Sequence, residues 1–173
     1  FIIKEKLYKI PTNSSPFLNK ELLQAAAWLH ECGKFISFPR FHRHSSYLIS
    51  HYRLMGFSQK ERLLIGLVAR YHRKGIASKR NPDCECLGSE EIEFINLLAS
   101  ILRLASAANR TRKKLIKSLF IKLSKKQIII TIINRYAKIT PSLDIDKMII
   151  EKESLEKILG YPIEIKTFEP TIN

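Results

Sequence analysis

The sequence has few acidic residues. Only 16 Asp and Glu stand against 30 Lys and Arg, so the formal net charge is +14 and the isoelectric point is about 9.8. Acids are absent altogether from residues 32–60 and from residues 103–126. A positive field of this size concentrates phosphate-bearing ligands near the surface. We therefore expect a polyanionic partner.

Cysteine is also scarce, and three cysteines cannot form a disulfide framework in a chain of 173 residues. This predicts a reducing compartment, the cytoplasm. Two of the cysteines, Cys84 and Cys86, form the pattern DCEC. A single C-x-C with no second pair is a weak zinc signal, so an inert surface loop is the better interpretation.

No segment approaches the ~18 consecutive apolar residues that span a bilayer, and the first residues show no signal-peptide pattern. The sequence therefore predicts no membrane partner. It also lacks a glycine-rich phosphate loop and any serine or cysteine triad pattern. With 45% hydrophobic residues, the chain can bury a core. We expect one globular domain, or one domain with a small appendage.

Hydrophobic periodicity predicts helices over the first two thirds of the chain. Asn19 is a candidate N-cap for a first helix, and Gly33 stands where a left-handed C-cap would end it. Ser45 or Ser46 can start a second helix.

Two further helices have clear start signals. Ser58 and Glu61 form a capping box for a helix that ends at His72. Glu90 and Glu91 favour the positive N-terminal end of the next helix, which carries a long apolar stripe.

The hydrophobic period changes near residue 115. Residues 119–133, LFIKLSKKQIIITII, hold two β-branched runs around a polar turn that includes Lys125 and Lys126, which predicts a hairpin. Further along, the pattern predicts a strand at 148–150, a short helix at 154–159 ended by Gly160, and a strand at 162–166.

The predicted fold is mainly α. A helical domain covers residues 1–115, and a small α+β subdomain with an antiparallel sheet covers residues 116–173. The boundary is a change of structural class, because no flexible linker, internal repeat or low-complexity stretch lies between the two parts.

Three histidines have distinctive surroundings: His30, which Glu31 follows in AAAWLHECGKF, His44 in FHRHSSYLI, and His72 in LVARYHRKG. A helical scaffold that gathers imidazoles and a carboxylate can form a divalent-metal or a phosphate site. Hydrogen-bonded core histidines are the ordinary alternative, and it stays open.

Five segments resemble, in order and spacing, the C-terminal region of the exopolyphosphatase and guanosine pentaphosphate phosphohydrolase (Ppx/GppA) family. They are LHECGKFIS, FHRHSSYLI, GFSQKERLLIGLVARYHRKG, INLLASILRLASAANRTR and LEKILGYPIEI. The resemblance implies an HD-like helical core, a homodimer, and hydrolase chemistry in an upstream actin-like domain. The chain begins at Phe1 and not at methionine, which fits a piece of a longer protein.

The resemblance also implies a set of metal ligands, and this sequence departs from it. The candidate ligands here are His30, Glu31, His44 and His72. Ser106 and Asn109 stand in a region where family members often have aspartates, and no histidine precedes His30. A site stripped of anionic ligands in a basic environment should bind an anion better than a cation. We expect no cofactor for this chain, and a divalent ion (Mg or Mn) only in the parent protein.

Basic residues surround the same motifs and predict a phosphate-binding cleft. Guanidinium forks and imidazole donors near helix ends suit chains of phosphate. The predicted polyanion-binding residues are Arg40, Arg43, His44, Arg70, His72, Arg73 and Lys74. A solvated basic face is the alternative for any single run. The aromatic residues nearby are expected to fill the core, although stacking on bases is the other possibility: Trp28, Phe35, Phe38, Phe41 and Tyr47.

The sequence therefore predicts a region that binds inorganic polyphosphate or guanosine pentaphosphate and supports a homodimer, with no catalytic residue of its own. Two other functions stay open. One is an autonomous HD-type, metal-dependent phosphohydrolase that acts on a nucleotide. The other is a nucleic-acid-binding module, which we expect less than polyphosphate binding.

Overall fold

The computed structural model describes residues 16–124, 127–136 and 139–168. They divide into two compact units within α5, so that the first unit ends at Leu102 and the second begins at Arg103. The first unit is helical and the second contains a sheet, which confirms the predicted mainly α fold with a small α+β part. Whether residues 1–115 and 116–173 behave as separate domains stays a prediction.

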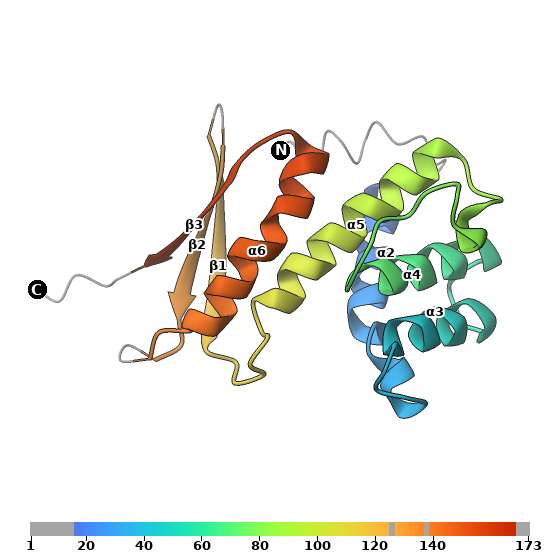
Figure 1. Cartoon of the computed structure of the whole chain (residues 1–173), viewed down its shortest axis with the longest axis horizontal. Helices are drawn as coiled ribbons and strands as arrows, with labels where there is room; N and C mark the ends of the chain where they lie inside the picture. The colour runs from blue at the N-terminus through green and yellow to red at the C-terminus, as the bar shows by residue number, and fades with distance from the viewer. Residues whose placement is uncertain (1–15, 125–126, 137–138, 169–173) are drawn as a thin grey trace, which may run out of the picture. The chain divides into compact units, whose positions relative to one another are not determined.

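The first unit is built from helices (Figure 1). In chain order they are α2 (Pro16–Leu29), the 3₁₀ helix η1 (Cys32–Phe35), α3 (Phe41–His51), α4 (Gln59–Tyr71), the 3₁₀ helix η2 (Pro82–Cys84) and α5 (Ser89–Ala107), which continues into the second unit. In the described part of the chain, no helix is long and apolar enough to cross a membrane.

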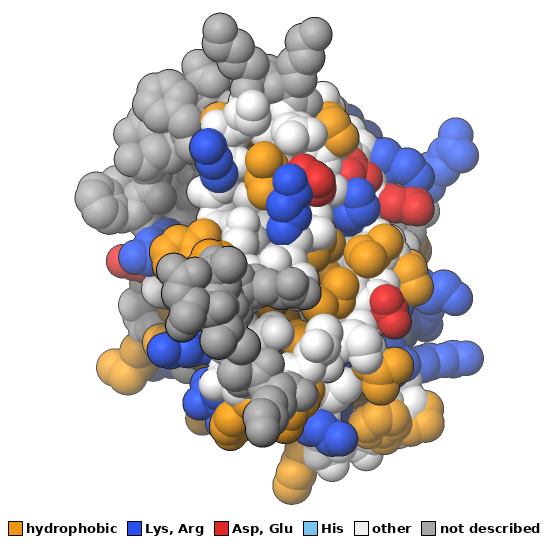
Figure 2. Space-filling view, turned by 90° about the vertical axis from the view of Figure 1, so that its left-hand side faces the viewer, with side chains coloured by type: hydrophobic (Ala, Val, Ile, Leu, Met, Phe, Trp, Pro, Cys, Tyr) orange, Lys and Arg blue, Asp and Glu red, His pale blue; other side chains and the backbone are white. Residues whose placement is uncertain are grey.

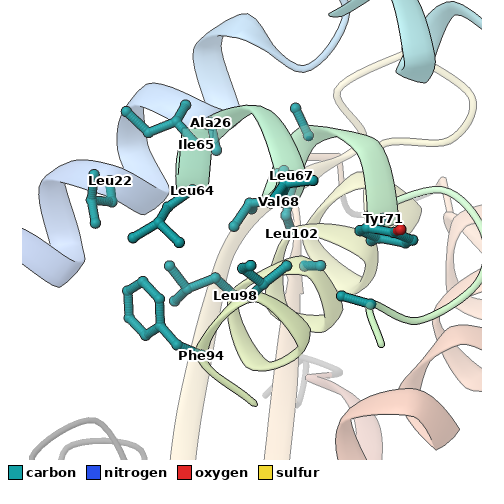
Figure 3. Packing of buried hydrophobic residues seen from close by; sticks show 14 of the residues in the cluster. Leu22, Ala26, Leu64, Ile65, Leu67, Val68, Tyr71, Phe94, Leu98 and Leu102 are labelled. Atoms are coloured by element: carbon teal, nitrogen blue, oxygen red, sulfur yellow. The ribbon is translucent and has the colours of Figure 1, made fainter. Parts of the chain in front are cut away.

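Helix α4 forms the centre of the core of the first unit. Its apolar side chains point toward those of α2 and α5 (Figure 3). The buried residues that meet there include Leu22, Ala26, Leu64, Ile65, Val68, Phe94 and Leu98. Because α4 is buried along most of its length, its last turn is held at a fixed place, and the residues that follow it are positioned for the site described below.

The structure confirms the start and stop signals of α4 and the start signal of α5. The Ser58 hydroxyl accepts a hydrogen bond from the Glu61 N–H at 3.3 Å, and the Glu61 carboxylate accepts one from the Ser58 N–H at 2.6 Å. His72 is the C-cap of α4. Glu90 and Glu91 lie in the first turn of α5.

Two predicted helix starts are wrong. Helix α2 begins at Pro16 and not after Asn19, and proline suits a first turn because its missing N–H needs no partner there. Helix α3 begins at Phe41, so Ser45 and Ser46 lie inside it. Ser45 is fully buried. Its hydroxyl bonds to another segment of the chain and not to the start of its own helix.

Gly33 is not the left-handed cap that the sequence predicts. It lies within η1, and the residues with positive φ do not include it. A side chain at Gly33 would collide with the carbonyl oxygen of Phe41 and the backbone nitrogen of Ser45. Glycine is therefore needed here because two backbones come into contact.

The second unit holds a three-stranded sheet and a helix beside it (Figure 1). Its elements are β1 (Ile116–Leu123), β2 (Ile128–Asn134), α6 (Ser142–Leu159) and β3 (Ile163–Phe168), with strand order β1-β2-β3. Strands β1 and β2 are antiparallel, with Ile121 opposite Ile130, which confirms the predicted hairpin. Lys125 and Lys126 of its turn lie outside the described residues.

The sheet is mixed, and the prediction that it is wholly antiparallel is wrong for one strand pair. Strands β2 and β3 are parallel, with Ile130 opposite Ile165. A parallel pair needs a crossover connection, and α6 supplies it. The predicted strand at 148–150 lies within α6, which is longer than the predicted helix at 154–159.

Helix α6 shows its helical period in its buried residues, which are Asp144, Met148, Leu155 and Leu159. Asp144 is fully buried. It accepts hydrogen bonds from the N–H and the hydroxyl of Thr111 at 2.7 and 2.9 Å, and this fixes the start of the helix. Gly160, with φ of 74°, ends the helix as predicted.

The backbone contact at Gly33 leads to a prediction about stability. The substitution Gly33→Ala should lower the free energy of unfolding by about 1–3 kcal/mol, because the added methyl group forces α3 away from η1. Urea unfolding followed by circular dichroism measures this change.

Gly88→Ala is the matched control, because the nearest atom to its new methyl group, Glu91 Oε2, is at an ordinary contact distance of 3.6 Å. It should change the free energy by less than about 0.5 kcal/mol. Equal losses in the two variants would show that the contact at Gly33 is not tight.

Candidate functional site

The ring of Phe41, at the start of α3, is the centre of the candidate site. The ring centroids of His72 and His42 lie 6.1 and 6.0 Å from that of Phe41. Two cations also face this ring: Lys34 Nζ at 4.8 Å and Arg73 Cζ at 5.0 Å from its centroid. These distances are typical of cation–π contacts. We call these five residues the Phe41 cluster.

His30 joins the cluster through His72. The two imidazole rings meet edge to face, with centroids 4.8 Å apart and an interplanar angle of 81°. His30 Nδ1 lies 2.6 Å from the carbonyl oxygen of Ala27, and His72 Nδ1 lies 2.6 Å from that of Ala69. Because a carbonyl only accepts, each Nδ1 carries a hydrogen and donates it. The helix ends themselves therefore fix the orientation of both rings.

The carboxylate of Glu31 is directed toward a cation. It forms an ion pair with Lys34, whereas its Oε1 lies 4.0 Å from His30 Nε2. Among the described residues, no three His, Cys, Asp or Glu side chains come together in an arrangement that could hold a metal ion. That His30, Glu31, His44 and His72 hold a metal ion stays a prediction.

His42 reports the electrostatic character of the site. Burial, and after it nearby positive charges, lower the pKa of His42 from 6.5 to about 4. In decreasing order of effect these charges belong to Arg73, Arg70, Arg43 and His44. The Nδ1 atom of His42 is buried and has no hydrogen-bond partner in the described structure. The site is therefore rich in cations, and it keeps this imidazole neutral.

The cations around His42 are unequally compensated. Arg70 Nε lies 2.6 Å from Asp83 Oδ2, as an ion pair, although its N–H is not aligned for a hydrogen bond. Arg43 and Arg73 are exposed, and no carboxylate of the described residues forms an ion pair with either. Positive charge is therefore in excess at this surface and available to an anion.

The structure brings most of the predicted site residues together. The rings of His30 and His72 are in contact, and the Glu31 carboxylate lies 4.0 Å from His30 Nε2. Arg43, His44, Arg70 and Arg73 all lie near enough to His42 to lower its pKa. Arg40 precedes α3 in a left-handed conformation, with φ of 57°, and is exposed, as is Lys74. That these residues bind a polyanion stays a prediction. Ser106 and Asn109 belong to the second unit.

Sequence reasoning missed Phe41, His42 and Lys34 as site residues. The signal for His42 was available, because it lies two residues before His44 in FHRHSS. Nothing in the sequence shows that the ring of Phe41 faces two cations, because this depends on the packing of α3 against η1 and the end of α4.

Two other expectations are wrong. Of the aromatic residues expected in the core, only Phe41 is buried, and the exposed ones are Trp28, Phe35, Phe38 and Tyr47. Cys84 is also buried, within reach of the Tyr71 hydroxyl at 3.8 Å, and it does not belong to a surface loop. Burial raises the pKa of its thiol.

The family model and the relatives that match this chain point to the same family. The family model described as "Ppx/GppA phosphatase, domain III" matches residues 4–146. A guanosine-5'-triphosphate,3'-diphosphate pyrophosphatase of Pseudoalteromonas translucida is 42% identical over 55 residues, which are 32% of this chain and 11% of that protein. The protein of the same name from Vibrio vulnificus is 42% identical over 57 residues, 33% of this chain and 12% of its own length.

The low pKa of His42 leads to a prediction about pH. Between pH 6.5 and about 4 the unfolded chain binds a proton that the folded chain does not. The contribution of His42 to stability is therefore lost as pH falls through this window, and it is fully present above pH 6.5. In the variant His42→Gln, the free energy of unfolding should fall less steeply between pH 6.5 and 4.5 than in the unmodified chain. Urea unfolding at several pH values tests this, and identical slopes would contradict it.

Proposed function

Because the chain belongs to the Ppx/GppA phosphatase family, we propose that the surface around the Phe41 cluster binds the phosphate chain of a polyanion. The candidate ligands are inorganic polyphosphate and guanosine pentaphosphate, the compound that appears in the names of the relatives. One observation carries this proposal: His42 is surrounded by cations, two of which, Arg43 and Arg73, have no described carboxylate partner. Adjacent phosphates can accept bidentate hydrogen bonds from such guanidinium groups.

We assign to these residues the binding of the ligand and not the cleavage of its phosphoanhydride bond. The segments that match the named relatives make up only 11–12% of those proteins. The described residues also offer no set of three metal ligands. In this proposal, the chain holds the polyanion while another part of the parent protein performs the hydrolysis.

A comparison of two sets of charge removals tests the binding. Replacing Arg40, Arg43, Arg73 and Lys74 together with alanine should weaken polyphosphate binding by at least about tenfold, because each lost phosphate contact removes a favourable release of counterions. The matched control replaces four exposed lysines of the second unit, Lys113, Lys117, Lys122 and Lys157. Fluorescence anisotropy with labelled polyphosphate at fixed salt measures both.

Two results would contradict the proposal. Equal losses from the two sets would mean a diffuse basic surface without a site. Release of phosphate by the purified chain with magnesium or manganese, abolished in His30→Ala, would instead indicate an autonomous metal-dependent phosphohydrolase.

We also infer that two copies of the chain associate through β1. This strand forms one edge of the sheet, and its side chains Leu119, Phe120 and Ile121 are exposed. Figure 2 shows one face of the molecule, on which hydrophobic side chains reach the surface among Lys and Arg. An edge strand presents unpaired backbone groups. A second copy can pair with them across a two-fold axis.

Sedimentation velocity over a range of concentrations tests this association. Ile121→Lys should shift the chain toward monomer, because it puts a charged side chain in place of an exposed apolar one on the edge strand. Ile150→Lys on α6 is the matched control, since the two isoleucines are 62% and 61% exposed. A chain that is monomeric before substitution, or variants that dissociate equally, would rule out the β1 interface.

A further inference from the structure

The exposed aromatic residues near the start of α3 need an explanation that a phosphate chain does not provide. Phe35 is 97% exposed, Phe38 is 67% exposed and Tyr47 is 62% exposed. Rings left in water give up the favourable free energy of burial. Inorganic polyphosphate has no ring or apolar group to cover them. Their exposure therefore favours a partner with flat apolar surfaces, and the exposed cations beside them, Arg40 and Arg43, favour one with negative charge.

Helix α3 arranges charges and rings along one face. Arg43, Tyr47 and His51 follow each other at intervals of four residues, so they lie on the same side of the helix, and all three are exposed. The opposite side holds the buried Phe41 and Ile49. The rings of Tyr47 and His51 are stacked, with centroids 4.2 Å apart and an interplanar angle of 25°. The exposed face of α3 therefore presents a guanidinium followed by a stacked pair of rings.

Another exposed ring and another exposed cation precede the N-terminal end of the helix. The ring of Phe38 lies 6.2 Å from that of Phe41, and Lys34 Nζ lies 5.7 Å from the Phe38 centroid. Arg40 stands between Phe38 and the helix in the chain and is exposed. The exposed rings of Phe38 and Tyr47 thus flank Arg40 and Arg43 along the chain, and the 11 residues of α3 alone span about 16 Å.

Positive charge predominates around this face, since Glu91, which lines a pocket together with His51, forms an ion pair with Lys60. Residues 32–60 contain no acid, and the neighbouring Glu31 forms an ion pair with Lys34. Aromatic side chains on a positively charged surface are the usual means of binding single-stranded nucleic acid, because every base has a face that can stack. A membrane surface fits less well. A helix that docks on lipid presents an apolar face, whereas the exposed residues of α3 include no aliphatic side chain.

We propose that the exposed face of α3, together with Phe38, binds single-stranded RNA. Arg40 and Arg43 contact the phosphates, and bases stack on Tyr47 and on Phe38. This activity goes beyond the binding of a phosphate chain, because the aromatic side chains take part only when the ligand carries bases.

Two ligands distinguish the contributions. A labelled single-stranded RNA of 12 nucleotides and an inorganic polyphosphate of about 12 phosphates are measured by anisotropy at the same salt concentration, since both respond to counterion release. The double variant Phe38→Ala with Tyr47→Ala should lose about 5- to 100-fold in RNA affinity. Its affinity for polyphosphate should stay within about twofold of the unmodified chain.

The matched control is Phe168→Ala with Tyr136→Ala, which removes one phenylalanine and one tyrosine of the second unit, each 52% exposed. It should leave RNA binding unchanged. Single substitutions at Tyr47 separate the effect of stacking from that of side-chain size. Tyr47→Trp keeps an aromatic ring and should keep RNA affinity, whereas Tyr47→Leu keeps an apolar side chain without a ring and should lower it. Thermal unfolding by circular dichroism verifies that every variant is folded.

Three outcomes would overturn the proposal. One is an equal loss of RNA and polyphosphate affinity in the Phe38 and Tyr47 variant. The second is binding of an abasic strand as tightly as the intact RNA. The third is cosedimentation with phosphatidylserine vesicles that requires Phe38 and Tyr47 while RNA binding does not, which would mean that the face docks on a membrane.

Discussion

The contact between the chain that follows α2 and the start of α3 determines the geometry of the whole candidate site. Gly33 lies directly against the backbone of α3. The buried hydroxyl of Ser45 donates to the carbonyl of His30 at 2.8 Å and accepts from the N–H of Gly33 at 2.9 Å. A buried backbone group without a partner costs about 1–3 kcal/mol, so this hydroxyl holds the two segments together. The result is that His30 meets His72 and that Lys34 reaches the ring of Phe41.

Electrostatics then gives the site its preference for anions. Several cations lie near a half-buried, neutral imidazole, and the ring of Phe41 faces one of them, Arg73, together with Lys34. A cation–π contact at an exposed position is worth only about 0.5–1 kcal/mol, and an aromatic ring has no net charge to offset that of a cation. The aromatic contacts position the cations but do not neutralise them. A bound anion relieves the repulsion between these cations and therefore stabilises the folded chain by mass action.

Local signals in the sequence predicted local structure well. The capping box at Ser58, the glycine stop at Gly160 and the hairpin are encoded by neighbouring residues, and the structure has all three. The errors arose where a distant segment decides. Ser45 resembles a helix cap but bonds to residues 12 and 15 positions away. The run at 148–150 resembles a strand but belongs to a helix whose buried face contacts other parts of the second unit.

The candidate site was predictable to the extent that it depends on sequence motifs. The motifs around His30 and His72 indicated that these residues belong together, and their rings are in contact. The role of Phe41 and the exposure of its aromatic neighbours could not be predicted, because both depend on which face of α3 is buried.

Because one face of α3 is buried and the other is exposed, the same helix can take part in two kinds of binding. The buried face of α3 supports the Phe41 cluster, and burial of that face places Arg43, Tyr47 and His51 in solvent. Arg43 acts on His42 and also belongs to the exposed face. Its charge attracts any polyanion, and the attraction weakens equally for all of them as salt screens it. Charge therefore cannot distinguish a phosphate chain from a nucleic acid on this surface. Only the rings can, because stacking requires a base.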